Sequence, residues 1–404
     1  MKTSEAAVVE RKHGRTAQNG AFTVVVIGGG YAGLQTLLAL RKELGPDAAN
    51  LILIDRNESH LQKVMLFRRA ASAENIEVPF TRLRRHGAAF IRAEVRNIDR
   101  ESRAVELELP DGTKAVQSYD RLVIAAGSIA AAAPADRGGI ELAGPGEADR
   151  IRGELRRLVD RAAGGGTMPR VVVVGGGASG IETAAEIAAG LKRMAAQAGL
   201  PAERGAAVTL LDRGERLLPQ ASAYVSGRLE AELRKAGVET LSGRRAARFA
   251  DGAVELESGE RLDAGLCIWT TGQRANPVCA AWGLPVDPEG RVLTETGYRL
   301  KGSADIYAVG DCARVCDPST GRIDGMSCRE ATAQARLLAK AIAADWEHRP
   351  APAHRAAPFV LCLALGPDRG FAWTRFLHRD IVLTGALGLK AREYTWSLTN
   401  LLGK

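Results

Sequence analysis

A glycine-rich turn that joins an apolar run to a helical pattern occurs twice in this chain of 404 residues. The first copy, FTVVVIGGGYAG, covers residues 22–33, and the second, PRVVVVGGGASG, covers residues 169–180. Both apolar runs lack polar alternation, which predicts strands buried on both faces of a parallel sheet. Because coincidence would have to produce the whole strand–turn–helix order twice, the repeat predicts an α/β fold with two doubly wound domains.

Each turn has the G-x-G-x-x-G spacing of a dinucleotide-binding site. In the first copy Gly28 permits the tight turn, Gly30 leaves room for a pyrophosphate, and Gly33 lets the helix pack close to the strand. Asp55 ends the next apolar run, about 20 residues after the last glycine, where a carboxylate accepts hydrogen bonds from ribose hydroxyls. Strand, turn, helix, second strand and acid therefore predict a dinucleotide site.

The second copy repeats this order with a longer interval. Gly175, Gly177 and Gly180 form the turn, and Asp212 ends the following apolar run. A carboxylate at that position repels a 2′-phosphate and favours NADH over NADPH. Arg213 directly follows it and is able to pair with the same phosphate, so NADPH stays open.

The distribution of charge and of cysteines indicates which binding partners and which cellular compartment to expect. The formal net charge is +8, but no basic stripe alternates with aromatic residues, which argues against nucleic-acid binding. All six cysteines lie between residues 267 and 362, and the N-terminus has no apolar signal segment. No apolar run reaches the length of about 18 residues that suggests a membrane span. We therefore expect a cytoplasmic protein with reduced thiols, a disordered leader at residues 1–20 and no metal site.

The segments around the two units have their own patterns. Residues 60–85 predict a helix, a loop and a second helix, and the segment from residue 89 alternates as antiparallel strands do until residues 119–128 return to a buried apolar run. A later apolar strand ends at Gly310 and Asp311. An alanine-rich helix is expected over residues 326–346, followed by strands and a terminal helix.

The motifs VVVIGGGYAGL, YDRLVIAAGS, VVVVGGGASGIETAAEIA, CIWTTGQRANP and DIYAVGDCA follow one another in this order. In them the chain resembles the two-dinucleotide-binding-domain flavoproteins, specifically the type II NADH dehydrogenase and apoptosis-inducing-factor-like group. The resemblance covers residues 22–338. It implies two Rossmann-like domains, with the NAD domain inserted in the FAD domain, and a small C-terminal α+β domain. The implied domains are an FAD-binding domain at 21–135 and 269–345, an NAD(P)H-binding domain at 136–268 and a C-terminal domain at 346–404.

The resemblance also implies the residues that contact each cofactor. For FAD the implied residues are Gly28, Gly30, Gly33, Asp55, Val95, Gly127 and Asp311, and further candidate contacts are Tyr31, Ala32, Arg56, Lys63, Ala126, Gly310 and Arg329. For NADH, with NADPH possible, they are Gly175, Gly177, Gly180, Glu182, Asp212 and Gly272.

Glu182 and Lys63 are the candidate catalytic residues. Glu182 matches a glutamate that lies by the nicotinamide and flavin in this group, and its alternative role is to complement the helix dipole. Lys63 is placed to reach the flavin N5 edge, and its alternative is an ordinary surface lysine. Arg56 either covers the adenine or is solvated, and Arg329 either faces the flavin or is an ordinary helix residue.

Two departures from the group bear on the electron acceptor. The chain has neither C-x-x-C nor C-x-x-x-x-C, so dithiol chemistry on that pattern is not expected. Type II NADH dehydrogenases usually have A-Q-x-x-x-Q-Q at the quinone end of the flavin, whereas here only Gln334 remains of that pattern.

The resulting hypothesis is an FAD-dependent NAD(P)H dehydrogenase that passes electrons to a quinone-like small molecule. Three alternatives stay open: a tailoring oxidoreductase for a specialised metabolite, a reductase of a protein electron carrier, and an NADH-responsive redox sensor. The expected oligomeric state is a monomer or homodimer. Peripheral membrane contact through the terminal helix is possible, although Lys390, Arg392 and Lys404 are its only cations.

Overall fold

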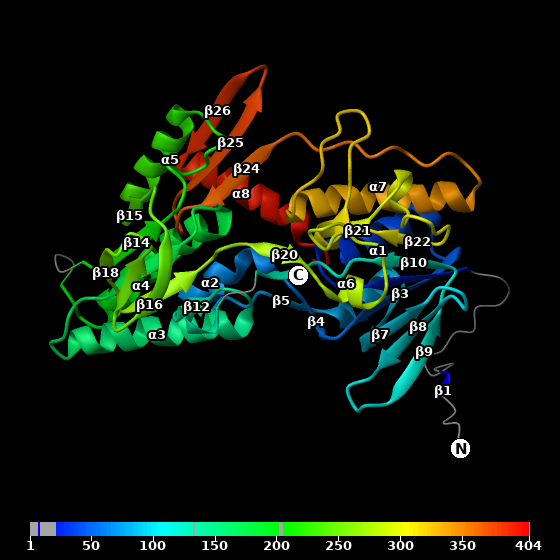
Figure 1. The fold of residues 1–404 in the computed structure, drawn as a ribbon, viewed down its shortest axis with the longest axis horizontal. Coiled ribbons are helices and arrows are strands. Elements are labelled where there is room, and N and C mark those ends of the chain that lie inside the picture. Colours follow the sequence, from blue (N-terminus) through cyan, green and yellow to red (C-terminus); the bar gives the residue numbers. More distant parts are fainter. Residues whose placement is uncertain (1–6, 9–21, 132–133, 202–204, 404) are drawn as a thin grey trace.

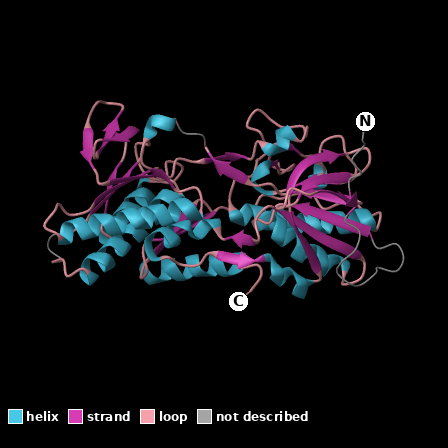
Figure 2. Cartoon of the chain, turned by 90° about the horizontal axis from the view of Figure 1, so that it is seen from below, coloured by secondary structure: helices cyan, strands magenta, loops and turns pink. Residues whose placement is uncertain are grey.

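Two parallel sheets lie side by side along the long axis of the molecule, with helices packed against them (Figures 1 and 2). The computed structural model describes residues 7–8, 22–131, 134–201 and 205–403. The first sheet has the order β22-β10-β2-β3-β6 and the second the order β12-β19-β13-β14-β15, with every neighbouring pair parallel. The predicted α/β fold with two dinucleotide-type sheets is thereby confirmed.

The first sheet carries the first glycine turn. Its strands are β2 (Phe22–Ile27), β3 (Ala49–Asp55), β6 (Ala88–Arg92), β10 (Arg121–Ile124) and β22 (Ile306–Ala308). Helices α1 (Tyr31–Leu44) and α7 (Cys328–Trp346) pack together beside it. Val24, Val25 and Val26 are completely buried, as expected of a strand covered on both faces.

The second sheet lies between two visits of the chain to the first, because β22 returns to the first sheet after β19 is complete. Its strands are β12 (Ile140–Glu141), β13 (Arg170–Val174), β14 (Ala207–Leu211), β15 (Val238–Leu241) and β19 (Leu266–Trp269). Its helices are α3 (Pro145–Ala163), α4 (Ala178–Gln197) and α5 (Ala223–Lys235). At the two crossings, β11 (Ser128–Ala130) pairs with β20 (Gln273–Ala275). These crossings agree with an inserted second domain, while the residue limits of the domains stay predictions.

Small antiparallel sheets flank the parallel ones. One contains β7 (Glu94–Asp99), β8 (Ala104–Glu108) and β9 (Lys114–Ser118), and another contains β16 (Ala246–Ala250), β17 (Ala253–Leu256) and β18 (Arg261–Asp263). Other short elements are β4 (Ser59–Leu61), β5 (Glu77–Pro79), α6 (Val278–Ala281), β21 (Val292–Leu293) and β23 (Ala313–Arg314).

The C-terminal residues form a three-stranded antiparallel sheet and one helix. The strands are β24 (Val360–Ala364), β25 (Gly370–Phe376) and β26 (Arg379–Thr384), and the helix is α8 (Gly385–Thr399). Phe371 and Trp373 of β25 belong to the core of the second domain, whereas Leu402 packs into the core of the first. The C-terminal unit therefore bridges both domains, and Figure 1 shows α8 lying between them, beside α7.

Local structure differs from the sequence prediction in three places. The helix expected first in residues 60–85 is α2 (Leu66–Ser72), but the second is a 3₁₀ helix over Phe80–His86. Strand β6 was expected to be antiparallel and instead pairs in parallel with β3. Of the predicted disordered leader, Ala7–Val8 form strand β1 beside β9, and the other residues of the leader fall outside the described ones. No helix in the described ranges is both long and apolar enough to cross a membrane.

Candidate functional site

The first glycine turn is built so that only its outward side is open. Gly28 has φ +104°, and a Cβ there would lie 2.2 Å from the carbonyl oxygen of Ala125. A Cβ on Gly33 would lie 1.9 Å from the carbonyl oxygen of Gly28, so the helix packs directly on the turn. A Cβ on Gly30 would meet no atom within 4 Å. The backbone at Gly30, at the start of α1, is therefore free to approach a phosphate.

Asp55 fastens this turn from the end of β3. Its Oδ2 accepts the Gly29 N–H at 2.6 Å, and its Oδ1 accepts the Asn57 N–H at 2.7 Å. The Gly28 N–H donates to the carbonyl of Ile54 at 2.8 Å. The acid is thus held beside the turn, where a ribose lies when a dinucleotide binds to this motif.

The second turn repeats this geometry. The Gly176 N–H donates to Asp212 Oδ1 at 2.9 Å, and the Gly175 N–H donates to the Leu211 carbonyl at 2.8 Å. A Cβ on Gly180 would lie 1.8 Å from the Gly175 carbonyl oxygen, whereas a Cβ on Gly177 would meet no atom within 4 Å. The residues present therefore fit a dinucleotide in both domains, and the individual cofactor contacts stay predictions.

Lys63, Ser128 and Asp311 come together from three distant parts of the chain. The Ser128 hydroxyl donates to Asp311 Oδ2 at 2.6 Å, and Lys63 Nζ donates to the Ser128 carbonyl at 3.4 Å. Burial raises the pKa of Asp311, which Ser128 and the charge of Lys63 oppose. Burial lowers the pKa of Lys63, and the charge of Asp311 acts in the opposite direction. Sequence analysis did not single out Ser128, although it directly follows the AAG of a buried strand.

Glu182 lies in the first turns of α4 and is only 3% exposed. Its Oε1 accepts Arg392 Nε–H at 2.8 Å and the Ala364 N–H at 2.9 Å, and its Oε2 accepts Arg392 Nη2–H at 2.9 Å. Burial raises the pKa of Glu182, and the charge and hydrogen bonds of Arg392 act in the opposite direction. The contacts tie the second domain to the C-terminal unit, a role that sequence analysis missed for Arg392.

Arg392 lies among groups from every unit of the fold. Its guanidinium lies 4.9 Å from the centre of the Trp396 ring, and the guanidinium of Arg68 in α2 lies 4.3 Å from the centre of the same ring. Burial raises the pKa of both Tyr31 and Cys328, and the charge of Arg392 opposes both shifts. Tyr31 begins α1 and Cys328 begins α7, so the N-terminal ends of these two helices meet here.

The other predicted site residues lie at the rim of this region or apart from it. Arg56 is exposed, and the Arg329 guanidinium donates to the carbonyls of Pro358 and Val360. The carbonyl of Val95 accepts the indole N–H of Trp282 at 3.2 Å. The carbonyls of Ala126 and Gly127 accept from the Asn276 side chain and backbone, and a Cβ on Gly272 would meet no atom within 4 Å. Ala32 is buried in the first turn of α1.

Comparisons with known proteins agree with this geometry. The family model for pyridine nucleotide-disulphide oxidoreductases matches residues 22–337. An NADH dehydrogenase-like protein of Mycobacterium tuberculosis is 31% identical over 377 residues, which cover 90% of each chain. A type II NADH:quinone oxidoreductase of Staphylococcus epidermidis is 29% identical over 72% of this chain and 74% of its own.

Solved structures show the same architecture. NDH2 from Plasmodium falciparum superposes with a TM-score of 0.77 over 95% of this chain and 97% of that one, at 14% identity, which demonstrates a shared fold. The matches confirm the predicted flavoprotein fold and the predicted class of oxidoreductase, and they agree with FAD and NADH as its cofactors. The chain belongs to the pyridine nucleotide-disulphide oxidoreductase family.

Proposed function

We propose that the chain takes a hydride from NADH onto FAD and passes the electrons to a quinone or quinone-like small molecule. The observation that carries this proposal is the pair of matching turns, in which Asp55 and Asp212 each accept the central glycine N–H. The names of relatives support the acceptor, since the Staphylococcus epidermidis protein is an NADH:quinone oxidoreductase.

Bound FAD supplies the hydride-accepting and electron-transferring chemistry. The chain's part is to hold two cofactors in register. The turns at Gly30 and Gly177 hold the pyrophosphates against the starts of α1 and α4, while Asp55 and Asp212 hold the riboses. Asp311, whose carboxylate accepts the Ser128 hydroxyl, would hold the ribityl chain. Holding both nucleotides in place would lower the entropic part of the barrier to hydride transfer.

Lys63 and Glu182 are the proposed proton carriers for reduction of the acceptor. Burial lowers the pKa of Lys63, which makes its ammonium group a better acid. Glu182 has all its hydrogen bonds directed to Arg392 and Ala364, so it takes part only when the Arg392 ion pair opens. The two residues therefore differ: Lys63 makes no ion pair of this kind in the described residues, whereas Glu182 depends on release of the Arg392 side chain.

Peripheral membrane contact, a monomeric or homodimeric state and a cytoplasmic location stay predictions. The C-terminal unit exposes Phe376 and Leu377 at the turn between β25 and β26, and Leu387 and Tyr394 on α8. These apolar side chains favour contact with a membrane surface, and co-sedimentation with anionic vesicles tests it.

The decisive experiment is anaerobic rapid mixing of the yellow protein with NADH or NADPH, followed by menadione or a ferredoxin. We expect NADH to bleach the flavin absorption quickly and menadione to restore it. Restoration by ferredoxin but not by menadione would identify a protein carrier as acceptor. Rapid bleaching without restoration by either would contradict a dehydrogenase and favour a redox sensor.

A further inference from the structure

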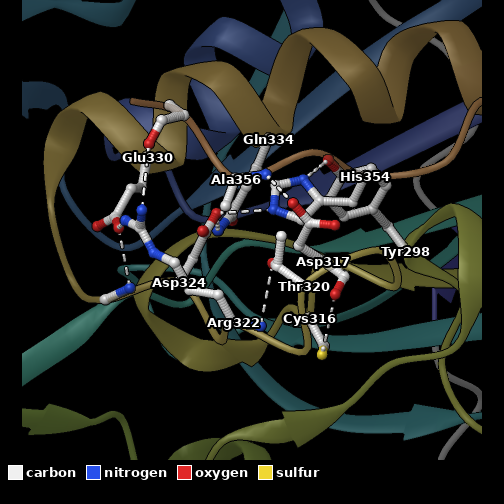
Figure 3. A network of polar contacts seen from close by, with 12 residues as sticks. Tyr298, Cys316, Asp317, Thr320, Arg322, Asp324, Glu330, Gln334, His354 and Ala356 are labelled. Atoms are coloured by element: carbon white, nitrogen blue, oxygen red, sulfur yellow. Dashed lines mark hydrogen bonds and ion pairs between the residues drawn. The ribbon is translucent and has the colours of Figure 1, made fainter. Parts of the chain in front are cut away.

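A buried chain of polar contacts runs from Gln334 of α7 through Asp324 to His354, in the segment that follows α7 (Figure 3). It also reaches the backbone of Gly310. The Gly310 N–H donates to Gln334 Oε1 at 2.9 Å, and Gln334 Nε2–H donates to Asp324 Oδ2 at 2.9 Å. The same Asp324 oxygen lies 3.0 Å from His354 Nε2, and His354 Nδ1 lies 2.8 Å from the Tyr298 hydroxyl. All four side chains are buried, so water does not compete for these contacts.

Asp324 decides which way the Gln334 amide faces. An ionised carboxylate only accepts hydrogen bonds, so Gln334 must turn its NH₂ group to Asp324 and its oxygen to Gly310. Burial alone would raise the pKa of Asp324, but the hydrogen bonds from His354 and Gln334 outweigh it and hold that pKa below its usual range. The carboxyl group is therefore ionised at neutral pH.

Gly310 transmits this orientation to the cofactor side of the first domain. Its φ is +77°, and a Cβ there would lie 2.7 Å from the Cβ of Ala32, in the first turn of α1. The next residue, Asp311, accepts the Ser128 hydroxyl. Rotation of the Gln334 amide would place its NH₂ group against the Gly310 N–H, and the turn that carries Asp311 would have to move.

We propose that Asp324, supported by His354 and Tyr298, is a positioning residue for FAD: it orients Gln334, which holds the Gly310–Asp311 turn in the form that binds the ribityl chain. The proposal rests on the proposed function only in taking Asp311 as an FAD contact, and it does not involve the acceptor. It also gives Gln334 a role within the protein, because both ends of its amide are bonded to protein groups.

The test is the rate at which FAD leaves the holoenzyme after dilution, followed by the fluorescence of released FAD. Asp324→Asn presents Gln334 with an amide that no longer dictates its orientation, and we expect FAD to leave at least about tenfold faster, the change that about 1.4 kcal/mol produces. Asp317→Asn is the matched control. Asp317 accepts the Ala356 N–H in the segment that contains His354, but it makes no contact with Gln334. We expect its FAD release to stay within about twofold of the wild type.

The double variant Asp324→Asn with Gln334→Glu is designed to restore the chain of contacts, with the negative charge moved from residue 324 to residue 334. The introduced glutamate would accept from the Gly310 N–H and from the NH₂ group of the introduced asparagine, placed where Asp324 Oδ2 lies now. The second N–H of that NH₂ group would donate to His354 Nε2, with the imidazole proton on Nδ1. We expect its FAD release to return to within about threefold of the wild type.

Unchanged FAD release in Asp324→Asn, or additive losses in the double variant, would overturn the proposal. Circular dichroism of the apoproteins shows whether each variant folds. If Asp324→Asn does not fold, a folded, FAD-retaining double variant supports the proposal and an unfolded one contradicts it. Wild-type reduction by NADH and reoxidation by menadione are measured in parallel. Their failure would count against the proposed function and leave the FAD-release comparison intact.

Discussion

The guanidinium of Arg392 in α8 donates hydrogen bonds to both carboxylate oxygens of Glu182 in α4, at 2.8 and 2.9 Å. This contact joins the second domain to the C-terminal unit. Both side chains are almost fully buried. Removing one member of a buried ion pair leaves the other charge uncompensated, which costs about 3–5 kcal/mol. We therefore expect Arg392→Met to lower the free energy of unfolding by about that amount, measured by denaturant titration.

The control for this prediction is Arg392→Met combined with Glu182→Gln. The glutamine oxygen still accepts the Ala364 N–H, and neither charge of this ion pair remains. The double variant should recover most of the lost stability. A double variant as unstable as Arg392→Met alone would show that packing, and not the uncompensated carboxylate, explains the loss.

Glu182 also has a predicted role in chemistry that is separable from stability. If it carries protons to the acceptor, Glu182→Gln should lower turnover with menadione and flatten its pH dependence, while the rate of flavin reduction by NADH is unchanged. Rapid-mixing measurements of the two half-reactions separate these effects. Wild-type turnover and pH dependence would leave Glu182 with only its structural role at α8.

Gly30 and Gly177 occupy equivalent positions in the two glycine turns, here called the two cradles, so the same substitution can be made in each. Both have extended backbone angles that alanine adopts, and a Cβ on either meets no protein atom within 4 Å. Gly30→Ala should therefore fold normally but bind FAD more weakly, by about tenfold or more. Gly177→Ala should retain FAD and raise the KM for NADH. The same defect in both variants would mean that the turns do not serve separate nucleotides.

The two cradles could be predicted because their parts lie close together in sequence. In each, strand, turn, helix and acid follow in order, and the structure places Asp55 and Asp212 beside their turns. The hydrogen bonds that the two carboxylates accept from glycine N–H groups were not predicted. The 3₁₀ helix over Phe80–His86 was missed, although Phe80 and Leu83 are its two buried residues. A spacing of three residues fits a 3₁₀ helix of one or two turns, and the pattern is too short to distinguish it from an α-helix.

The contacts that complete the site could not be predicted in this way. Ser128 and Asp311 lie 183 residues apart, and Glu182 and Arg392 lie 210 apart. Ser128 and Asp311 meet when two distant segments of the first domain come together, whereas Glu182 and Arg392 meet when the second domain contacts the C-terminal unit. Neither residue of a pair has a local pattern that points to the other. The direction of β6 was missed for a related reason: alternation shows that a strand is half-buried but not which neighbour it joins.

Asp212 is expected to select NADH against NADPH. Its carboxylate lies at the end of β14, held by the Gly176 and Gly214 N–H groups, and it would repel a 2′-phosphate. Asp212→Asn should therefore raise kcat/KM for NADPH relative to NADH by about tenfold, equivalent to about 1.4 kcal/mol. Adding Arg213→Ala should reduce that gain, because Arg213 is exposed beside it and able to pair with the phosphate. An unchanged ratio in Asp212→Asn would contradict this assignment.

Asp324 gives a prediction for stability as a function of pH. Its pKa in the folded protein lies below the ordinary value of 3.8, so the folded state holds the ionised carboxylate more strongly than the unfolded state does. The resulting stabilisation is complete above the unfolded pKa and is lost as the pH falls through the folded pKa. The stability difference between wild type and Asp324→Asn should therefore shrink between about pH 5 and pH 2. Denaturant titrations at a series of pH values measure this difference, and the many other carboxyl groups cancel because both proteins contain them. A difference that stays constant over this range would show that Asp324 is not held ionised by Gln334 and His354.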